Sequence, residues 1–526
     1  MPEFEVVAVD IVVLMAYILL ARFIPLWIAG SQEDADDFFL GGRDFVWPII
    51  GFSLFATNMS GSSFVGLAGA GYNQGVSVYN YEWSAAIILI FFIFFILPFY
   101  LRSGVYTMPG FLKQRFDYRS RRVSSGINLF FNMFIDAAGA LYAGALVFVL
   151  LFDIPLWGAV AALALLAAII SVFGGLKAVV VSDTIQAVML IIGGSMVAIA
   201  AYMQLPSWGA VIDTAGEEAL SVFKPPSDPN MPWPGLFTGV LVIGTYFWTS
   251  NQLIVQRTLG AKTMNHGRWG SLFAGFLKLP VLFFMILPGT MALVLYLDLS
   301  NADMVFPVLV FDLLPVGAGG LVLATLVAAI TSSIDSILNS VSTLVTMDFV
   351  KPLYPDLSER HIVITGQVVT AVALLVAILW APQIQRFETL WGYLQSVLAY
   401  TTPPIVATFV GGIFWTQANR HGAFVTLLLG VGLGVVFFVL NEILGVFAIQ
   451  FLYAAGVSLV MSVLILVGVS LATEPPPADK TEELTWNASY WHAETEALKD
   501  LAWWQNYRYH SVLPALCTVV ILYLFA

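Results

Sequence analysis

A run of small polar residues interrupts an apolar stretch near the start of the chain. Residues 57–63 read TNMSGSS, in which only Met59 is apolar, and membrane-grade apolar residues flank the run on both sides. In hydrocarbon every backbone N–H and C=O must be satisfied within the protein, so such a break is tolerated where it lines a cavity. Transporters bind ions and substrate at breaks of this kind. The alternative is a close helix–helix contact made by the small residues Gly66, Gly69 and Gly71.

A second polar cluster lies between residues 328 and 340. Its hydroxyl and carboxylate groups belong to Thr331, Ser332, Ser333, Asp335 and Ser336. On a helix, Ser332 and Ser336 are i,i+4 neighbours that share a face with Asp335. Hard cations take oxygen ligands, so the hydroxyls of Ser332 and Ser333, together with carbonyls of an unwound 56–59 segment, would suit Na⁺. The alternative is that the hydroxyls donate to carbonyls one turn earlier in their own helix.

A third stretch, GTYFWTSNQ at residues 244–252, places aromatic residues next to polar ones inside an apolar run. It lies five apolar runs after the first break, and corresponding breaks in two halves of a chain indicate an inverted-repeat transporter. An aromatic platform beside hydrogen-bonding groups is suited to a polyhydroxylated ring. The alternative is an aromatic belt at the membrane interface.

Several charged or amide side chains also lie within apolar runs, where they are costly and therefore functional candidates. They are Glu82, Asp136, Asp183, Lys278, Asp335 and Gln395. A structural alternative remains for each: Lys278 can pair with a carboxylate, and Asp183 can cap a helix.

These residues must be positioned by membrane helices. The 526 residues are 59% hydrophobic and only 10% charged, with a mean hydropathy of +0.88, which is typical of an integral membrane protein. One cysteine, Cys517, excludes an intrachain disulfide, and five scattered histidines disfavour a His-based metal site. The first run lacks a signal-peptide cleavage pattern and is predicted to be retained. We predict an all-α integral membrane protein with 14 spans, at about 6–30, 46–71, 77–101, 124–151, 154–173, 179–203, 235–256, 269–298, 315–346, 361–381, 388–415, 421–441, 445–472 and 508–526.

The distribution of basic residues predicts the orientation in the membrane. Lys and Arg gather in the loops after the third, seventh, ninth and eleventh spans, whereas the opposite loops hold only Lys224 and Arg386. The basic side is therefore expected to be cytoplasmic. With 14 spans, both the N-terminus and the C-terminus are then extracellular or periplasmic. We expect the chain to lie in a plasma membrane, such as a bacterial inner membrane, with lipid and small solutes as partners and no nucleic acid.

The chain resembles the sodium:solute symporter family and, within it, the sodium/glucose cotransporter group. The resemblance covers about residues 36–415 and rests on DDFFLGGRDFVWPIIGFSLFATNMSGSSFVGLAGAGY, NYEWSAA, GVYTMPGFLKQRF, FGGLKAVVVSDTIQ, SNQLIVQRTLGAKT, AAITSSIDSILNSVSTLVTMDF and YLQSVLAYTTPPIVATFVGGIFW. It implies a five-plus-five inverted-repeat core with helices broken at the membrane midplane. The repeats would be 46–203 and 235–415, with an extra helix and loop at 1–45, an extracellular loop at 204–234, and extra helices with a cytoplasmic loop at 416–526.

The resemblance also implies roles for individual residues. A main sodium site would be formed by Ala56, Met59, Ala329, Ser332 and Ser333. Sugar contacts would come from Asn58, Ser63, Glu82, Lys278 and Gln395, with Phe247 as the inner aromatic gate and Trp248 beside it. Tyr81 and Asp136 are further candidate substrate-binding residues. A second sodium site, present in some members, would involve Asp183, Asp335 and Ser336.

Five positions depart from the pattern of the group. Ser63 stands where Gln or His is usual, Phe247 where the gate is Tyr, Gly244 where one member has a sugar-contacting Asn, Asp136 where Asn or Lys occurs, and Asp335 where Thr or Ala is more usual. These departures leave the particular substrate open.

The sequence predicts a transporter rather than an enzyme. We expect inward Na⁺ movement to drive uptake of a neutral sugar or polyol, that is, a hexose, pentose or inositol, by alternating access. Glu82 and Asp136 disfavour an anionic solute, and only Lys278 offsets them. The alternatives are an amino acid, nucleoside or cationic vitamin as substrate, a transporter-like solute sensor, or a channel; two broken helices around one site favour a carrier over a channel. The oligomeric state is left open.

Overall fold

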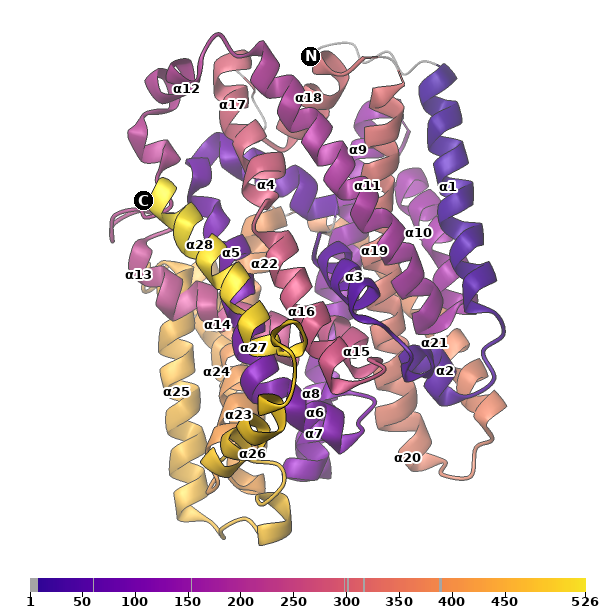
Figure 1. Cartoon of the computed structure of the whole chain (residues 1–526), viewed down its shortest axis with the longest axis vertical. Helices are drawn as coiled ribbons and strands as arrows, with labels where there is room; N and C mark the ends of the chain where they lie inside the picture. The colour runs from indigo at the N-terminus through magenta and orange to yellow at the C-terminus, as the bar shows by residue number, and fades with distance from the viewer. Residues whose placement is uncertain are drawn as a thin grey trace.

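The computed structural model describes residues 8–59, 61–152, 154–297, 299, 302–315, 317–386 and 390–526, and these residues form a helical bundle (Figure 1). Across these ranges, β pairing is limited to two isolated bridges, Phe45 with Ala261 and Lys224 with Pro232. The all-α prediction is therefore confirmed for the described chain.

The helices of the first half are α1 (Ala8–Ala29), α2 (Ala35–Leu40), α3 (Trp47–Asn58), α4 (Gly61–Gln74), α5 (Asn80–Phe91), α6 (Leu97–Ser103), α7 (Met108–Arg115), α8 (Tyr118–Phe130), α9 (Ala138–Phe152), α10 (Leu156–Phe173), α11 (Gly175–Gln204) and α12 (Trp208–Ala215). Those of the middle are α13 (Trp233–Gly235), α14 (Leu241–Thr245), α15 (Gln252–Leu259), α16 (Met264–Lys278), α17 (Leu287–Leu295), α18 (Val305–Leu313), α19 (Ala318–Thr343), α20 (Lys351–Leu353) and α21 (Glu359–Trp380). The last are α22 (Leu390–Thr401), α23 (Pro403–Phe414), α24 (Arg420–Phe438), α25 (Phe451–Ala472), α26 (Ala488–Lys499), α27 (Tyr507–His510) and α28 (Val512–Leu524).

Within the described residues, 11 helical stretches are long and apolar enough to cross a membrane, or 12 if α22 and α23, bent by 47°, form one span. Two of the predicted spans, 46–71 and 235–256, have no unbroken counterpart among them. Both contain an interruption, which divides each into helices too short to span hydrocarbon alone. The count of 14 spans stays a prediction.

The first interruption separates α3 from α4. Met59 has φ −83° and ψ 71°, outside the helical region, although its N–H still donates to the carbonyl of Phe55 at 3.0 Å. A break at this point is confirmed, but the expected unwinding of all of residues 56–59 is wrong, because 56–58 are still the last helical residues of α3. The small residues that follow also pack closely, because a Cβ on Gly71 would lie 2.3 Å from the carbonyl oxygen of Ile286 in the segment before α17. The break and the helix contact considered as its alternative are both present.

The second interruption separates α14 from α15. Residues Tyr246–Ser250 form a π-helical turn, and Asn251 then adopts φ −77° and ψ 124°. The Asn251 side chain accepts a hydrogen bond from the N–H of Leu253 at 2.9 Å and so caps α15. The predicted break in this span is confirmed as well.

The two ends of the bundle differ in charge. In Figure 1, α6, α7, α20 and α26 lie toward the bottom, and the strongly basic segment 102–122 belongs to this end. The α12 helix and the start of α1 lie at the top. The C-terminal end of α28 joins the α12 side, because the carbonyl of Phe525 accepts a hydrogen bond from the N–H of Val222 at 2.7 Å. Both ends of the described chain therefore lie toward the less basic end.

Helix α1 is attached to α19 through two charged side chains. Asp10 accepts hydrogen bonds from the N–H groups of Gly317 and Gly320, at 2.9 and 2.7 Å, at the start of α19. Near its other end, Arg22 forms an ion pair of 2.6 Å with Asp335 in the middle of α19. Both charged residues of α1 are buried, and both contact α19.

A C-terminal strap, residues 486–508, lies across the basic end. The N–H of Trp486 donates to the carbonyl of Ile413 in α23 at 2.7 Å, and Trp491 stacks on Phe94 with ring centroids 5.9 Å apart. Glu494 forms an ion pair with Arg268 at the start of α16. The strap thus joins α23 to α16 and to the turn between α5 and α6.

Candidate binding site

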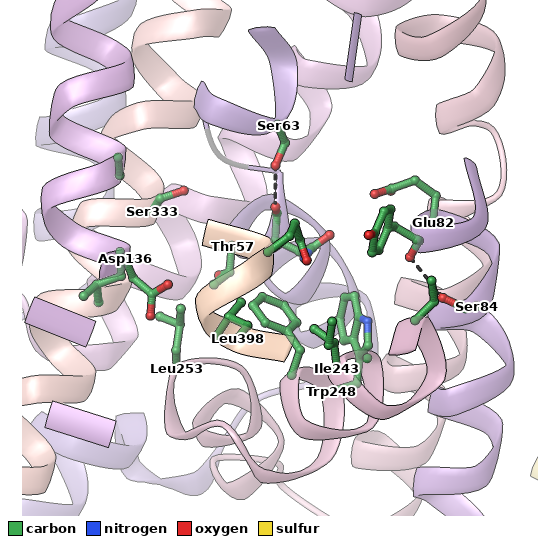
Figure 2. Close-up of a pocket in the computed structure, with 18 residues that line it drawn as sticks. Thr57, Ser63, Glu82, Ser84, Asp136, Ile243, Trp248, Leu253, Ser333 and Leu398 are labelled. Carbon is green, nitrogen blue, oxygen red and sulfur yellow. Dashed lines mark hydrogen bonds between the residues drawn. The ribbon is translucent and has the colours of Figure 1, made fainter. Parts of the chain in front are cut away.

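A cavity of about 160 Å³ lies beside the breaks in α3–α4 and α14–α15 (Figure 2). The predicted substrate-contacting residues that line it are Asn58, Ser63, Tyr81, Glu82, Asp136, Phe247, Trp248 and Gln395. Thr57 and Ser333 line it too. Residues from seven separate helical segments therefore meet at one cavity, as a binding site between broken helices requires.

Lys278 is the one predicted substrate residue that does not line the cavity. Its side chain is 1% exposed at the end of α16, where it forms an ion pair with Glu82 and donates a hydrogen bond to the side-chain oxygen of Asn58. The structural alternative, pairing with a carboxylate, therefore describes its contacts. Lys278 supports the cavity wall from behind by neutralising Glu82 and orienting Asn58.

The wall of the cavity is partly acidic and partly aromatic. In Figure 2, Asp136 and Glu82 lie on opposite sides of the cavity and Trp248 lies below it. Phe247 and Trp248 pack edge to face, with ring centroids 5.5 Å apart. Gly244 allows the close approach of α5, because a Cβ there would lie 2.5 Å from the Cδ1 of Ile88. The side-chain oxygen of Gln395 is buried and finds no hydrogen-bond partner in the described parts of the chain.

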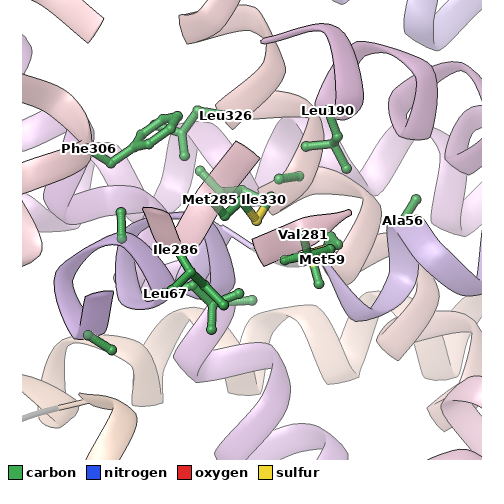
Figure 3. Close-up of a cluster of buried hydrophobic side chains, with 14 of the residues drawn as sticks. Ala56, Met59, Leu67, Leu190, Val281, Met285, Ile286, Phe306, Leu326 and Ile330 are labelled. Atoms are coloured by element: carbon green, nitrogen blue, oxygen red, sulfur yellow. The ribbon is translucent and has the colours of Figure 1, made fainter. Parts of the chain in front are cut away.

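The predicted main sodium ligands contribute oxygens of two kinds. Ala56 and Met59 have no side-chain oxygen, and their side chains are buried in an apolar cluster with Val281, Met285 and Ile330 (Figure 3). These two residues can therefore offer only backbone carbonyl oxygens. Ser333 faces the cavity, and its hydroxyl donates to the Ala329 carbonyl at 3.1 Å. Hydroxyls and carbonyls are a donor set that fits Na⁺. Across the described residues, no cluster of three or more His, Cys, Asp or Glu could hold another kind of metal.

Asp183 lies at the centre of a buried polar network beneath this region. Its carboxylate accepts hydrogen bonds from Ser53 at 2.5 Å, Thr57 at 3.2 Å and Ser332 at 2.6 Å. Arg257 supplies the counter-charge at 3.4 Å and also donates to the hydroxyl of Ser336. Asp183 is therefore linked through Thr57 to the cavity and through Ser332 to the predicted sodium ligands.

Asp335, the other acid of the predicted second sodium site, has different neighbours. One carboxylate oxygen faces Arg22 of α1 at 2.6 Å, and the other accepts a hydrogen bond from Ser171 of α10 at 2.8 Å. The family resemblance implied that Asp183 and Asp335 share a second sodium site. In the structure each of the two carboxylates has a guanidinium of its own.

Sequence reasoning missed Arg22 and underestimated Arg257. Arg22 is the single basic residue of the first apolar run, a signal equal to those used for Glu82 and Asp136. Arg257 follows the seventh predicted span, where the basic residues were used only to predict the orientation, but its side chain is fully buried. Ser53 and Thr57 carried a weaker signal, since isolated hydroxyls are common in membrane helices.

Comparison with known proteins adds a family and a fold. The model of the "Sodium:solute symporter family" matches residues 38–430. The chain is 33% identical to sodium/myo-inositol cotransporter 2 of Bos taurus, over 92% of this chain and 80% of that protein. It is 30% identical to sodium/glucose cotransporter 1 of Ovis aries, over 91% of this chain and 81% of that protein. Its fold is similar to that of a substrate-bound, outward-open Na⁺-coupled sialic acid symporter, with a TM-score of 0.80 and 23% identity over 90% of this chain and 99% of that one.

Proposed function

Because the chain belongs to the sodium:solute symporter family, a family of transporters and not of enzymes, we propose that it couples inward Na⁺ movement to the uptake of a neutral sugar or polyol. A hexose, a pentose or an inositol is the expected substrate. The names of the relatives, sodium/myo-inositol and sodium/glucose cotransporters, support this class.

The observation that carries the proposal is the set of groups around the cavity. Glu82, Asn58 and Gln395 offer hydrogen-bonding atoms on its wall, and Phe247 and Trp248 offer apolar faces. Hydroxyl groups bound by a carboxylate form charge-assisted hydrogen bonds, and the C–H face of a sugar ring packs on an aromatic surface. Lys278 balances the charge of Glu82, so the pair gives no net attraction for an ionic solute.

We assign the main Na⁺ site to the carbonyls of Ala56, Met59 and Ala329 and the hydroxyls of Ser332 and Ser333. Ser333 lines the substrate cavity. Asn58 also lines this cavity, and it lies between Ala56 and Met59 in the sequence. Bound Na⁺ would order the break and with it the substrate-binding side chains. Na⁺ then shifts the population toward the substrate-binding, outward-open state through its higher affinity for that state.

The proposed architecture is the five-plus-five inverted repeat, with repeats at 46–203 and 235–415. Each repeat has one broken helix near its start, α3–α4 in the first and α14–α15 in the second. Alternating access then exposes the cavity first to one side of the membrane and then to the other. We propose that the basic end is cytoplasmic and that both termini lie outside a plasma membrane, in bacteria the inner membrane.

A cationic solute, such as a cationic vitamin, is the second candidate, and Asp136 favours it. Its carboxylate lines the cavity and forms no ion pair within the described ranges. A positively charged solute would supply the missing counter-charge.

The experiment is uptake into proteoliposomes containing the purified full-length protein. The panel consists of radiolabelled glucose, xylose, myo-inositol and, for the cationic class, thiamine, each with an inward Na⁺ or K⁺ gradient. We expect concentrative uptake of at least one neutral polyol with Na⁺ only. Counterflow of that solute distinguishes a carrier from a channel or a sensor. Na⁺-driven uptake of thiamine alone would contradict the neutral class, and uptake that is independent of Na⁺ would contradict the coupling.

A further inference from the structure

Two buried carboxylates lie near the candidate sodium site, and the structure pairs each with an arginine. Asp183 of α11 pairs with Arg257 of α15, and Asp335 of α19 pairs with Arg22 of α1. The side chains of Arg22 and Asp335 are 6% and 1% exposed, so water contributes little to screening their charges. The two acids and two bases carry no net charge together.

Each carboxylate oxygen of Asp335 already has a partner. One of its oxygens faces the guanidinium at 2.6 Å and the other accepts a hydrogen bond from Ser171 at 2.8 Å. A Na⁺ ion next to this carboxylate would have to approach the guanidinium closely, and the repulsion between two cations in a buried site is large. Arg22 thus lies where a mobile cation would otherwise neutralise Asp335.

We propose that Arg22 acts as a fixed cation at Asp335 and thereby limits the transporter to one Na⁺ per substrate. This inference rests on the proposed sodium coupling and adds its stoichiometry. The guanidinium is covalently part of α1, so its charge stays with the protein through the cycle and contributes nothing to the driving force. Of the two predicted sodium sites, only the main site next to the cavity then binds Na⁺.

The groups around Asp335 are consistent with this role. Ser171 of α10 and Arg22 of α1 approach it from two different helices, and Asp183 and its partner Arg257 form the neighbouring pair. Ser336, one residue along α19, accepts a hydrogen bond from Arg257. Each predicted ligand of the second sodium site is therefore engaged by an arginine.

The test counts Na⁺ ions with ²²Na⁺ bound at saturation to the purified full-length protein in nanodiscs. The parent is expected to bind one ion. Arg22→Ala should bind two, because Asp335 then needs a mobile counter-charge. Arg22→Lys keeps the charge and should bind one, and so should the double variant Arg22→Ala/Asp335→Ala, which has neither charge.

The outcomes separate this inference from the proposed function. A parent that binds two ions, or a folded Arg22→Ala that still binds one, overturns the fixed-cation role. A parent that binds none contradicts the sodium coupling instead. If Arg22→Ala unfolds at low salt, it should be recovered in high NaCl but not in choline chloride, because only Na⁺ can replace the guanidinium; failure in both salts also overturns the inference.

Discussion

Glu82 is the residue whose charge matters most directly at the cavity. It lines the wall and is ion-paired with the buried Lys278. We predict that Glu82→Gln weakens substrate binding by ~1.5–3 kcal/mol, since hydrogen bonds to a charged acceptor contribute about that much. The half-saturation concentration for uptake would then rise roughly 10- to 150-fold.

Kinetics of uptake in proteoliposomes measure this effect, with ²²Na⁺ binding as the readout that should change little. Glu217→Gln, in the exposed 204–234 loop, is the matched control for loss of one acid. A half-saturation concentration equal to that of the parent would show that Glu82 does not bind the substrate.

Ser333 is the residue that connects the ion to the substrate, because it lines the cavity and is a predicted Na⁺ ligand. We predict that Ser333→Ala raises the Na⁺ concentration needed for half-maximal transport. Substrate affinity should fall at low Na⁺ and recover at saturating Na⁺, because the coupling of two ligands is reciprocal. Substrate binding measured at both Na⁺ concentrations checks this.

Thr325→Ala is the control for Ser333→Ala, since Thr325 lies on the same helix and donates to the carbonyl of Leu321 at 2.9 Å. A Ser333→Ala protein that saturating Na⁺ does not rescue would indicate a structural role for this hydroxyl.

At the scale of helices, the C-terminal strap attaches α16, which carries Lys278, to the turn between α5 and α6. Glu494 is its central acid and contacts Arg268, Tyr507 and Arg508. Burial alone would raise the pKa of Glu494, but Arg268 and these hydrogen bonds outweigh burial and hold the pKa below its usual value. The contribution of Glu494 to stability is therefore present above the pKa of the unfolded state, about 4.3, and is lost as the pH falls through the lower folded pKa.

We predict that Glu494→Gln lowers the stability of the protein at pH 7 by about 1–3 kcal/mol, because the arginines lose their charged partner. Thermal unfolding in detergent at pH 7 and at pH 4 measures the difference, which should shrink at the lower pH. Glu496→Gln is the matched control, as Glu496 forms an exposed ion pair with Lys499 of the same helix. Equal melting temperatures of parent and Glu494→Gln at pH 7 would contradict the role of the strap.

The two helix breaks were predictable because their cause is local. The sequences TNMSGSS and TSN place polar residues where hydrocarbon requires apolar ones, and α3 and the π-helical turn end there. The convergence of Glu82, Asp136 and Gln395 on one cavity followed from the family resemblance. The pairings of Arg22 and Arg257 were not predictable, because their partners lie 313 and 74 residues away and depend on how whole helices pack. Lys278 was assigned to the substrate, but helix packing directs it toward Glu82 and Asn58.

At the scale of the whole molecule, the proposed orientation can be tested by labelling. In a Cys517→Ser background, Glu217→Cys lies in the 204–234 loop and Asp479→Cys lies between α25 and α26. We predict that a membrane-impermeant maleimide labels the first in intact cells and the second only after permeabilisation, because the basic end is expected to face the cytoplasm. The reverse pattern would invert the proposed topology.

The attachment of α1 to the middle of α19 has a consequence for how this sequence can change over generations. Replacing either Arg22 or Asp335 alone strands the opposite charge in a buried site, which costs about 3–5 kcal/mol. That is a large part of the margin that keeps a folded protein above its threshold. Descendants with Thr or Ala at position 335 therefore have to lose the arginine in the same step, or first pass through a neutralised or sodium-stabilised intermediate. Two positions more than 300 residues apart are therefore expected to change together during evolution, because their side chains are in contact.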